Sequence, residues 1–275
     1  MKIVVKCSEK NEYQSYDDAD AFLVGNAYFA IHAGHSFSNQ ELKEFVEICR
    51  ILKKEVHVLV NQIFIENRIP ALREYLMFLK ELDVDRIYFS DMAVWEIAKK
   101  LEIENKCVFY HETLLRTSKE VEAYQKMGIP ELVVSPFMRA ESWQKCSGNL
   151  GITIYGYFPL YYTKRPILDV FSSRHPEVPL MKNSYHLVEK KREESFLFLK
   201  ERFGTTIFSS TPLDLFPDYE EYIRFKASFV IVDAIFLRRM DVKILLSTLK
   251  KDGPVDSPFH QGTNHFFHHR TGVKK

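Results

Sequence analysis

Several features that would assign this chain of 275 residues to a particular class of protein are missing. Its 38 basic and 37 acidic side chains nearly cancel, which leaves a net charge of +1. No overall positive field therefore attracts nucleic acid, and any such binding must come from a local patch. No apolar run approaches the length that spans a membrane, and the opening MKIVVKCSEKNEYQSYDD lacks the apolar core of a signal peptide. We expect a cytoplasmic protein with neither a membrane nor DNA as a partner.

Cysteine is scarce and scattered. The four cysteines, Cys7, Cys49, Cys107 and Cys146, contain no C-x-x-C pair, which excludes a zinc site built from sequence-local cysteine pairs. A disulfide framework is not expected in a reducing compartment. The simplest interpretation is that all four are small buried hydrophobic side chains.

The signatures of common enzymes are absent as well. The stretch HETLL (111–115) begins like the helix of a zinc peptidase, but Leu115 stands where the second histidine is needed. There is no G-x-S-x-G nucleophile elbow, no cysteine in a papain-like or caspase-like context, and no G-x-G-x-x-G after the first strand candidate. A peptidase mechanism or a dinucleotide site thus has no recognisable motif.

What the sequence does contain is an alternation of short β-rich runs with helical patterns. Most of the runs are continuously apolar, which is typical of strands buried on both faces of a parallel sheet. The strand candidates lie at 2–5, 21–25, 55–60, 86–90, 107–111, 131–135, 151–157 and 228–233.

Helix signals fall between these runs. Ser38 with Glu41, and Thr117 with Glu120, form capping boxes ahead of apolar residues at helical spacing. Asp91 stands where the N-cap of another helix is expected. Strands that alternate with helices in this way indicate a parallel sheet with the helices packed outside it.

Eight strand candidates favour a (β/α)₈ TIM-barrel-like fold, somewhat distorted, with an insertion after the seventh strand. A doubly wound open sheet is the main rival. We expect a single domain over 1–275: strands one to seven within 1–158, a loop and insertion at 159–204, the last strand and helix at 205–250, and a C-terminal tail at 251–275.

In such a barrel the active site lies at the carboxyl ends of the strands. The residues that this rule selects are Asn61, Ser90, Asp91, His111, Glu112, Ser135, Tyr157 and Asp233. Asp91 and Ser135 are well explained as helix caps or strand-end hydrogen bonds. His111 and Glu112 are neighbours that point to opposite faces of a strand, so only one of them can enter the barrel mouth.

Basic and aromatic residues gather between the seventh and eighth strand candidates. The basic residues are Lys164, Arg165, Arg174, Lys190, Lys191 and Arg192, and the aromatic ones are Tyr157, Phe158, Tyr161 and Tyr162. Rings beside cations suit a single-stranded RNA loop. The competing interpretation is an ordinary solvated face, since the run EKKREE is nearly balanced in charge.

Four histidines lie within ten residues near the C-terminus: His260, His265, His268 and His269. Imidazoles of this kind bind zinc or nickel, but an ordered site needs fixed second-shell partners, which a terminal segment rarely supplies. We expect surface histidines on a docked tail and no metal site.

The stretch GYFPLYYTKRPIL (156–168) resembles a degenerate form of the signature of peptidase family U32, the collagenase-like peptidases. Gly156, Tyr162 and Arg165 fall on matching positions, whereas Pro159 and Pro166 fall where the signature has cysteines. The stretches FSDMAVWEIAK, YHLVEKKREESF and GTTIFSSTPLDLF are similar to further segments of that family.

The resemblance implies a barrel, and it implies hydroxylation chemistry, because some members act on RNA bases or on a quinone precursor. Some are thought to hold an iron–sulfur cluster on four cysteines, two of them from the signature. Proline cannot ligate iron, so we expect no cluster and no cofactor here. A longer, cysteine-bearing paralogue and tRNA are the expected partners.

These expectations combine into one hypothesis: the chain acts in tRNA modification, namely the hydroxylation of wobble uridine. The substrate would be held by Asn61, Asp91, Tyr157, Tyr162, Lys164 and Arg165. His111 and Glu112 are the candidates for proton transfer. The alternatives are a peptidase of unassigned mechanism and a non-catalytic scaffold that pairs with a paralogue.

Overall fold

The computed structural model describes residues 1–111, 114–178, 180, 184–188, 194–251, 256–259 and 262–268. Eight parallel strands form a closed barrel, in which β7 pairs with both β6 and β13, and β13 pairs with β1. The barrel strands are β1 (Lys2–Lys6), β2 (Ala21–Gly25), β3 (Glu55–Val60), β4 (Arg86–Phe89), β5 (Cys107–Tyr110), β6 (Glu131–Val134), β7 (Leu150–Gly156) and β13 (Phe229–Asp233). Each coincides with one of the eight strand candidates, so the barrel prediction is confirmed and the open sheet is wrong.

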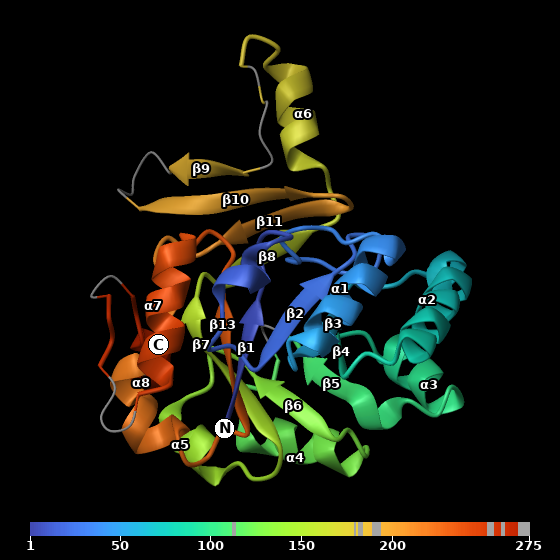
Figure 1. The fold of residues 1–275 in the computed structure, drawn as a ribbon. Coiled ribbons are helices and arrows are strands. Elements are labelled where there is room, and N and C mark those ends of the chain that lie inside the picture. Colours follow the sequence, from blue (N-terminus) through green and yellow to red (C-terminus); the bar gives the residue numbers. More distant parts are fainter. Residues whose placement is uncertain are drawn as a thin grey trace.

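Helices surround this barrel in Figure 1. They are α1 (Asn39–Ile51), α2 (Ile69–Leu82), α3 (Met92–Lys100), α4 (Ser118–Lys126), α5 (Ala140–Lys145) and α7 (Arg239–Leu249). The capping boxes at Ser38 and Thr117 are both present. The ring of helices is incomplete, because β1 is followed only by the 3₁₀ turn Glu12–Ser15 and β7 by the insertion and a short π-helix, Tyr219–Ile223. None of the described helices, of which α2 is the longest at 14 residues, is long and apolar enough to cross a membrane.

The barrel has two apolar regions because successive strand residues point to opposite faces. Inward-pointing side chains such as Val4, Leu59, Tyr88 and Phe229 fill the middle of the barrel. A larger cluster lies between strands and helices, and it contains all four cysteines, which are unpaired and buried. Burial raises the pKa of each thiol, to about 12 for Cys49 and Cys107. The prediction that the cysteines are buried hydrophobic side chains is confirmed.

The insertion after β7 folds into a four-stranded antiparallel sheet, in the order β8-β11-β10-β9. Its elements are β8 (Pro159–Thr163), α6 (Ile167–Arg174), β9 (Ser184–Val188), β10 (Ser195–Glu201) and β11 (Gly204–Phe208). Figure 1 shows this sheet lying across one end of the barrel, with α6 standing up from it. We call it the insertion sheet. It runs on to Phe208, a few residues beyond the expected 159–204, because β10 and β11 form a hairpin.

A short strand, β12 (Leu213–Asp214), pairs with β7. The C-terminal segment docks against β12 and against the turn that follows it. Thr263 forms an isolated bridge with Leu213, and Phe267, at the short helix α8 (His265–His268), is buried. Asp218 accepts hydrogen bonds from Asn264 and His268. His268 thus docks this segment, whereas His260 and His269 lie outside the described residues.

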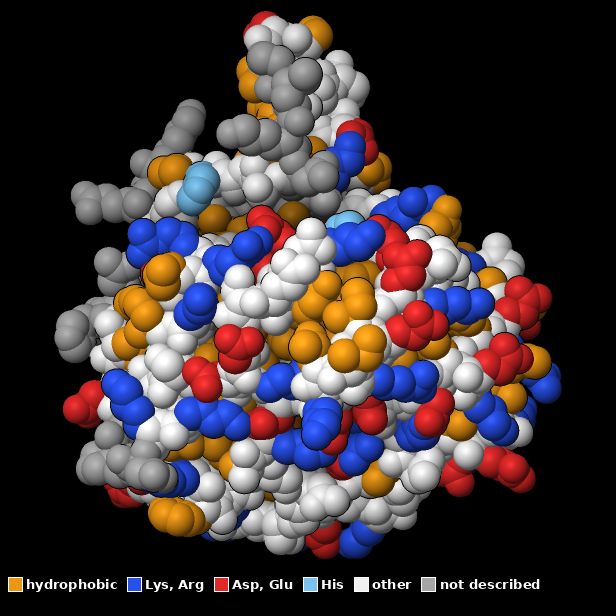
Figure 2. Space-filling model, in the orientation of Figure 1, with side chains coloured by type: hydrophobic (Ala, Val, Ile, Leu, Met, Phe, Trp, Pro, Cys, Tyr) orange, Lys and Arg blue, Asp and Glu red, His pale blue; other side chains and the backbone are white. Residues whose placement is uncertain are grey.

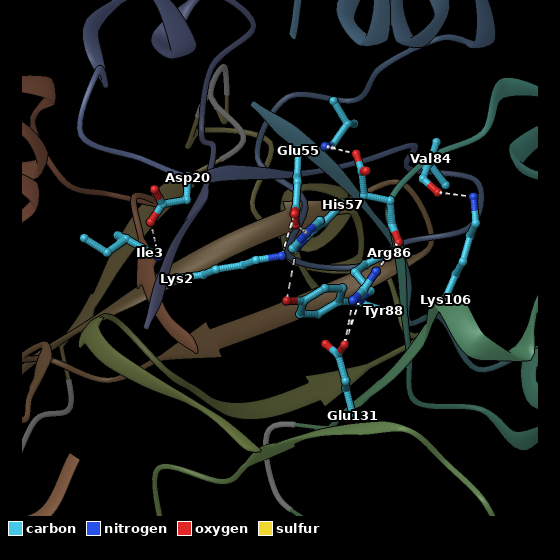
Figure 3. Close-up of polar contacts among 12 residues, drawn as sticks. Lys2, Ile3, Asp20, Glu55, His57, Val84, Arg86, Tyr88, Lys106 and Glu131 are labelled. Carbon is cyan, nitrogen blue, oxygen red and sulfur yellow. Dashed lines mark hydrogen bonds and ion pairs between the residues drawn. The ribbon is translucent and has the colours of Figure 1, made fainter. Parts of the chain in front are cut away.

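The amino ends of the strands are closed by polar contacts, shown in Figure 3. Glu55 lies between Lys2, at 2.5 Å, and the Nε2 of His57, at 3.1 Å. The Nδ1 of His57 lies 3.2 Å from the hydroxyl of Tyr88. In TIM barrels this end serves stability, and the active site lies at the carboxyl ends of the strands.

Candidate functional site

A pocket of about 210 Å³ lies at the carboxyl end of the barrel, beneath the insertion sheet. We call it the mouth pocket. Its lining comes from the loop after β2, the ends of β3, β4 and β5, and strand β8, namely Ile31, His32, Asn61, Ile63, Ser90, His111 and Pro159 to Tyr162. Its volume corresponds to about seven water molecules, which suits one flat ring rather than a peptide.

Asn61 is the most informative residue of the mouth pocket, because its amide is only half satisfied. Its Oδ1 accepts the backbone N–H of Ile31 at 3.0 Å, which fixes the orientation of the amide. Its side chain is buried, and its Nδ2 has no hydrogen-bond partner among the residues that the structure describes. The hydroxyl of Ser90 donates to the carbonyl of Asn61 at 2.7 Å and holds the end of β3 in place. A fixed, buried donor without a partner is costly unless a ligand accepts its hydrogen bond.

His32 enters the mouth pocket from a backbone in the left-handed region, with φ of 54°. Its backbone N–H donates to Glu201 at 2.5 Å, and its Nε2 lies 3.0 Å from the hydroxyl of Thr206. Thr206 itself donates to Glu201 at 2.6 Å, so the Nε2 of His32 carries the proton shared with Thr206. The insertion sheet therefore anchors a strained loop of the barrel through a buried histidine–hydroxyl–carboxylate chain.

A buried ion pair joins the first and last strands at the same end of the barrel. The Nζ of Lys6 lies 2.8 Å from Asp233, and both side chains are at most 5% exposed. The other oxygen of Asp233 accepts the backbone N–H of Ile235 at 3.0 Å. Such a pair persists only where its remaining hydrogen-bonding capacity is met, and here it fixes the closure between β13 and β1.

The structure brings three of the expected site residues together. Asn61, His111 and Tyr162 all line the mouth pocket. Burial raises the pKa of Tyr162 to about 12, and its hydroxyl donates to the carbonyl of Phe203 at 3.3 Å. Tyr157 lies next to a much smaller cavity that His111 also borders, on the side of β7 and β13.

Of the remaining expected residues, Tyr157, Asp91, Lys164 and Arg165 are described by the structure and do not line the mouth pocket. Asp91 uses both carboxylate oxygens on backbone amides, those of Ala93 at 2.9 Å and Phe64 at 2.8 Å. Lys164 donates to the carbonyl of Ile63 at 2.9 Å from a neighbouring hollow. Arg165 is exposed, and Glu112 lies outside the described residues.

The side chains at this end do not fit an iron–sulfur cluster. Pro159 and Pro166, at the positions where the resemblance implies cysteines, border the mouth pocket and the neighbouring hollow. The four thiols lie instead in the apolar layer behind the barrel wall, where their raised pKa values disfavour the thiolate that ligates iron. The absence of a cluster stays a prediction.

Sequence reasoning missed His32, Lys6 and Glu201. His32 follows the second strand by several residues, in AIHAGHSF, and so lies beyond the strand-end positions that the barrel rule selects. Lys6 ends the first strand, so its position could have identified it. Glu201 reaches His32 from 169 residues away, and no local pattern predicts that contact.

The model of peptidase family U32 matches residues 8–251. A protein of Bacillus subtilis (strain 168) named tRNA hydroxylation protein P2 is 25% identical over 214 residues, which cover 74% of this chain and 69% of that protein. The solved structure of a U32 peptidase superposes with a TM-score of 0.54 at 15% identity, over 84% of this chain and 91% of that one. The chain therefore belongs to peptidase family U32.

Proposed function

We propose that this protein acts in tRNA modification, in the hydroxylation of wobble uridine, and that the mouth pocket receives the uracil base. The observation that supports this proposal most directly is the unpartnered Nδ2 of Asn61, a buried donor on a residue that lines a pocket sized for one ring. Uracil offers exocyclic carbonyl oxygens that accept such a hydrogen bond, and enzymes that modify a base take it out of its stack.

The surroundings of Asn61 support this proposal. Tyr161 and Tyr162 line the pocket from β8 and offer rings for stacking, and His111 is the candidate for proton transfer. The name of the relative in Bacillus subtilis supports the same class of reaction. Because the residues present do not fit a cluster, we also propose that a longer, cysteine-bearing paralogue acts alongside this chain.

The test combines deletion of the gene with complementation, and mass spectrometry of bulk tRNA measures hydroxyuridine. We expect hydroxyuridine to disappear on deletion and to return with the wild-type gene, but not with Asn61→Asp. That variant keeps the Oδ1 acceptor for Ile31 and replaces the donor by an acceptor, so hydroxylation should fall by about 100-fold or more. Asn105→Ala, an exposed position far from the pocket, is the matched control and should restore full modification.

Unchanged hydroxyuridine in the deletion strain would disprove the function. Full restoration by Asn61→Asp would disprove the role of the mouth pocket. Thermal unfolding of purified Asn61→Asp separates loss of activity from loss of the fold.

A further inference from the structure

A second hollow, of about 440 Å³, lies beside the mouth pocket, between the loop after β3 and the hairpin that joins β10 to β11. We call it the flank pocket. Four basic side chains, Arg68, Lys164, Lys200 and Arg202, border it together with two acidic ones, Asp169 and Glu201. This concentration of basic side chains contrasts with the barrel face in Figure 2, where basic and acidic side chains are interspersed.

The acidic side chains of the flank pocket are already engaged. Asp169 pairs with Lys200 at 2.5 Å. Glu201 accepts hydrogen bonds from the backbone of His32 and from Thr206. Among the described residues, no carboxylate lies within ion-pairing distance of the remaining three cations.

Those three cations are held in place by neutral groups. The guanidinium of Arg68 donates to the Oε1 of Gln62 and to the carbonyl of Tyr28, and it lies over the ring of Phe203 at 4.5 Å. The guanidinium of Arg202 lies over the ring of Tyr28 at 3.7 Å. Stacking on rings fixes the position of an arginine without neutralising its charge.

Gln62 supplies an independent sign of a ligand. Its Oε1 is bound by Arg68, so its Nε2 has a fixed direction. In the described part of the chain this nitrogen has no partner, although the residue is only 1% exposed. Asn61 and Gln62 are consecutive at the end of β3, and they border different hollows, the mouth pocket and the flank pocket. Each residue has a buried amide nitrogen with no acceptor among the described residues.

We propose that the flank pocket binds a phosphodiester of the RNA strand whose base enters the mouth pocket. A phosphate offers acceptor oxygens to the Nε2 of Gln62 and charge to Arg68, Lys164 and Arg202, which resolves both the unpaired cations and the unpartnered donor. Tyr28 is 47% exposed, so its ring is accessible to RNA beside Arg202. The proposal rests on the proposed function for the identity of the strand, but the phosphate site is tested by binding alone.

The experiment measures binding of a fluorescein-labelled RNA stem–loop with a uridine in its loop, by anisotropy, over a series of salt concentrations. Gln62→Glu keeps the acceptor for Arg68 and replaces the Nε2 donor by a carboxylate oxygen that would repel a phosphate oxygen, so we expect the dissociation constant to rise about tenfold or more. Gln144→Glu makes the same change at an exposed position of α5 and should leave binding within about twofold of wild type.

The charge of Arg202 is tested in the same way. Arg202→Gln should weaken binding and lower the slope of log K against log salt by about 0.7, the value for one phosphate contact on a single strand. Lys145→Gln removes a charge from α5 and should leave that slope unchanged.

Inorganic tripolyphosphate, added as competitor, separates RNA from free phosphate compounds. Wild-type affinity for RNA in both Gln62→Glu and Arg202→Gln overturns the proposal. If these variants weaken the binding of tripolyphosphate but leave the binding of RNA unchanged, the assignment to RNA is also overturned. These readouts do not depend on hydroxylation, so failure of the deletion test leaves them interpretable.

Discussion

At the scale of single residues, glycine at position 156 allows the carboxyl end of β7 to lie close to β13. Its φ of 144° is unfavourable for residues with a Cβ, and a Cβ placed there would lie 2.6 Å from the Cβ of Asp233 and 2.9 Å from its carbonyl oxygen. Glycine thus lets β7 pass close to β13 where Asp233 pairs with Lys6. Gly156 also occupies the first position that matches the family signature, and close packing explains why a glycine is needed there.

Gly156→Ala should therefore lower the free energy of unfolding by about 3 kcal/mol, since backbone strain and overlap with Asp233 add. Gly128→Ala is the matched control, because Gly128 also has a positive φ, of 87°, but nothing lies within 4 Å of its Cβ position. It should cost only about 1 kcal/mol. Urea denaturation measures both, and equal losses would contradict the packing argument.

At the scale of elements, Asp91 connects two neighbouring βα units. It caps α3 through the amide of Ala93 and holds the loop before α2 through the amide of Phe64. The loop that Asp91 holds also carries Asn61, Gln62 and Ile63. Asp91 is thus a positioning residue for both pockets rather than a group that contacts the substrate.

Asp91→Ala should lower the free energy of unfolding by about 2 kcal/mol, since two backbone amides lose their acceptor. Asp91→Asn keeps one acceptor oxygen and should lose about half as much. Asp17→Ala, at an exposed carboxylate, is the control and should have little effect. Denaturation gives the stabilities. If Asp91→Asn abolished hydroxylation at wild-type stability, substrate contact would replace capping as its role.

At the scale of the whole molecule, the two ends of the barrel are built for different purposes. At the amino end the carboxylate of Glu55, the imidazole of His57 and the hydroxyl of Tyr88 each have a partner within the protein, as Figure 3 shows. At the carboxyl end, within the part of the chain that the structure describes, the amide nitrogens of Asn61 and Gln62 have no acceptor, and three cations have no carboxylate partner. Stability and ligand binding are therefore separated along the barrel axis.

Two titratable groups at the amino end of the barrel, Glu55 and His57, make the free energy of unfolding depend on pH. The hydrogen bond from His57, followed by that from Lys2, lowers the pKa of Glu55 to about 2, and burial lowers the pKa of His57. Both groups bind fewer protons when folded than when unfolded, so stability rises with pH. The contribution of Glu55 is complete above pH 4.5 or so and is lost as pH falls toward about 2. That of His57 begins to fall below about pH 6.5.

Glu55→Gln should thus lower the free energy of unfolding by about 1 kcal/mol at pH 7, and the difference from wild type should vanish near pH 2. Glu122→Gln is the control, because its pKa is also lowered to about 2 by Lys119 and Lys126, but at the exposed surface of α4. We expect a smaller loss that disappears in high salt. Thermal unfolding between pH 2 and 8 measures both; a difference for Glu55→Gln that persisted at pH 2 would contradict the mechanism.

The sequence by itself determined the barrel. Apolar runs such as 21–25 and 228–233, together with the helix caps at Ser38, Asp91 and Thr117, are local signals, and each acts over a few residues. Strand-end position also identified Asn61 and His111, because parallel strands that alternate with helices place their carboxyl ends at one face.

Only the tertiary structure decided how the barrel mouth is covered and charged. The insertion sheet places Glu201 and Thr206 on His32, and it places Phe203 and Arg202 beside Arg68 and Tyr28. These contacts join residues more than 130 positions apart, and side-chain packing between the barrel and the insertion sheet sets them. Whether an amide donor is satisfied likewise depends on the completed fold, since Asn61 and Gln62 become buried only when the loop after β2 and the insertion sheet close over them.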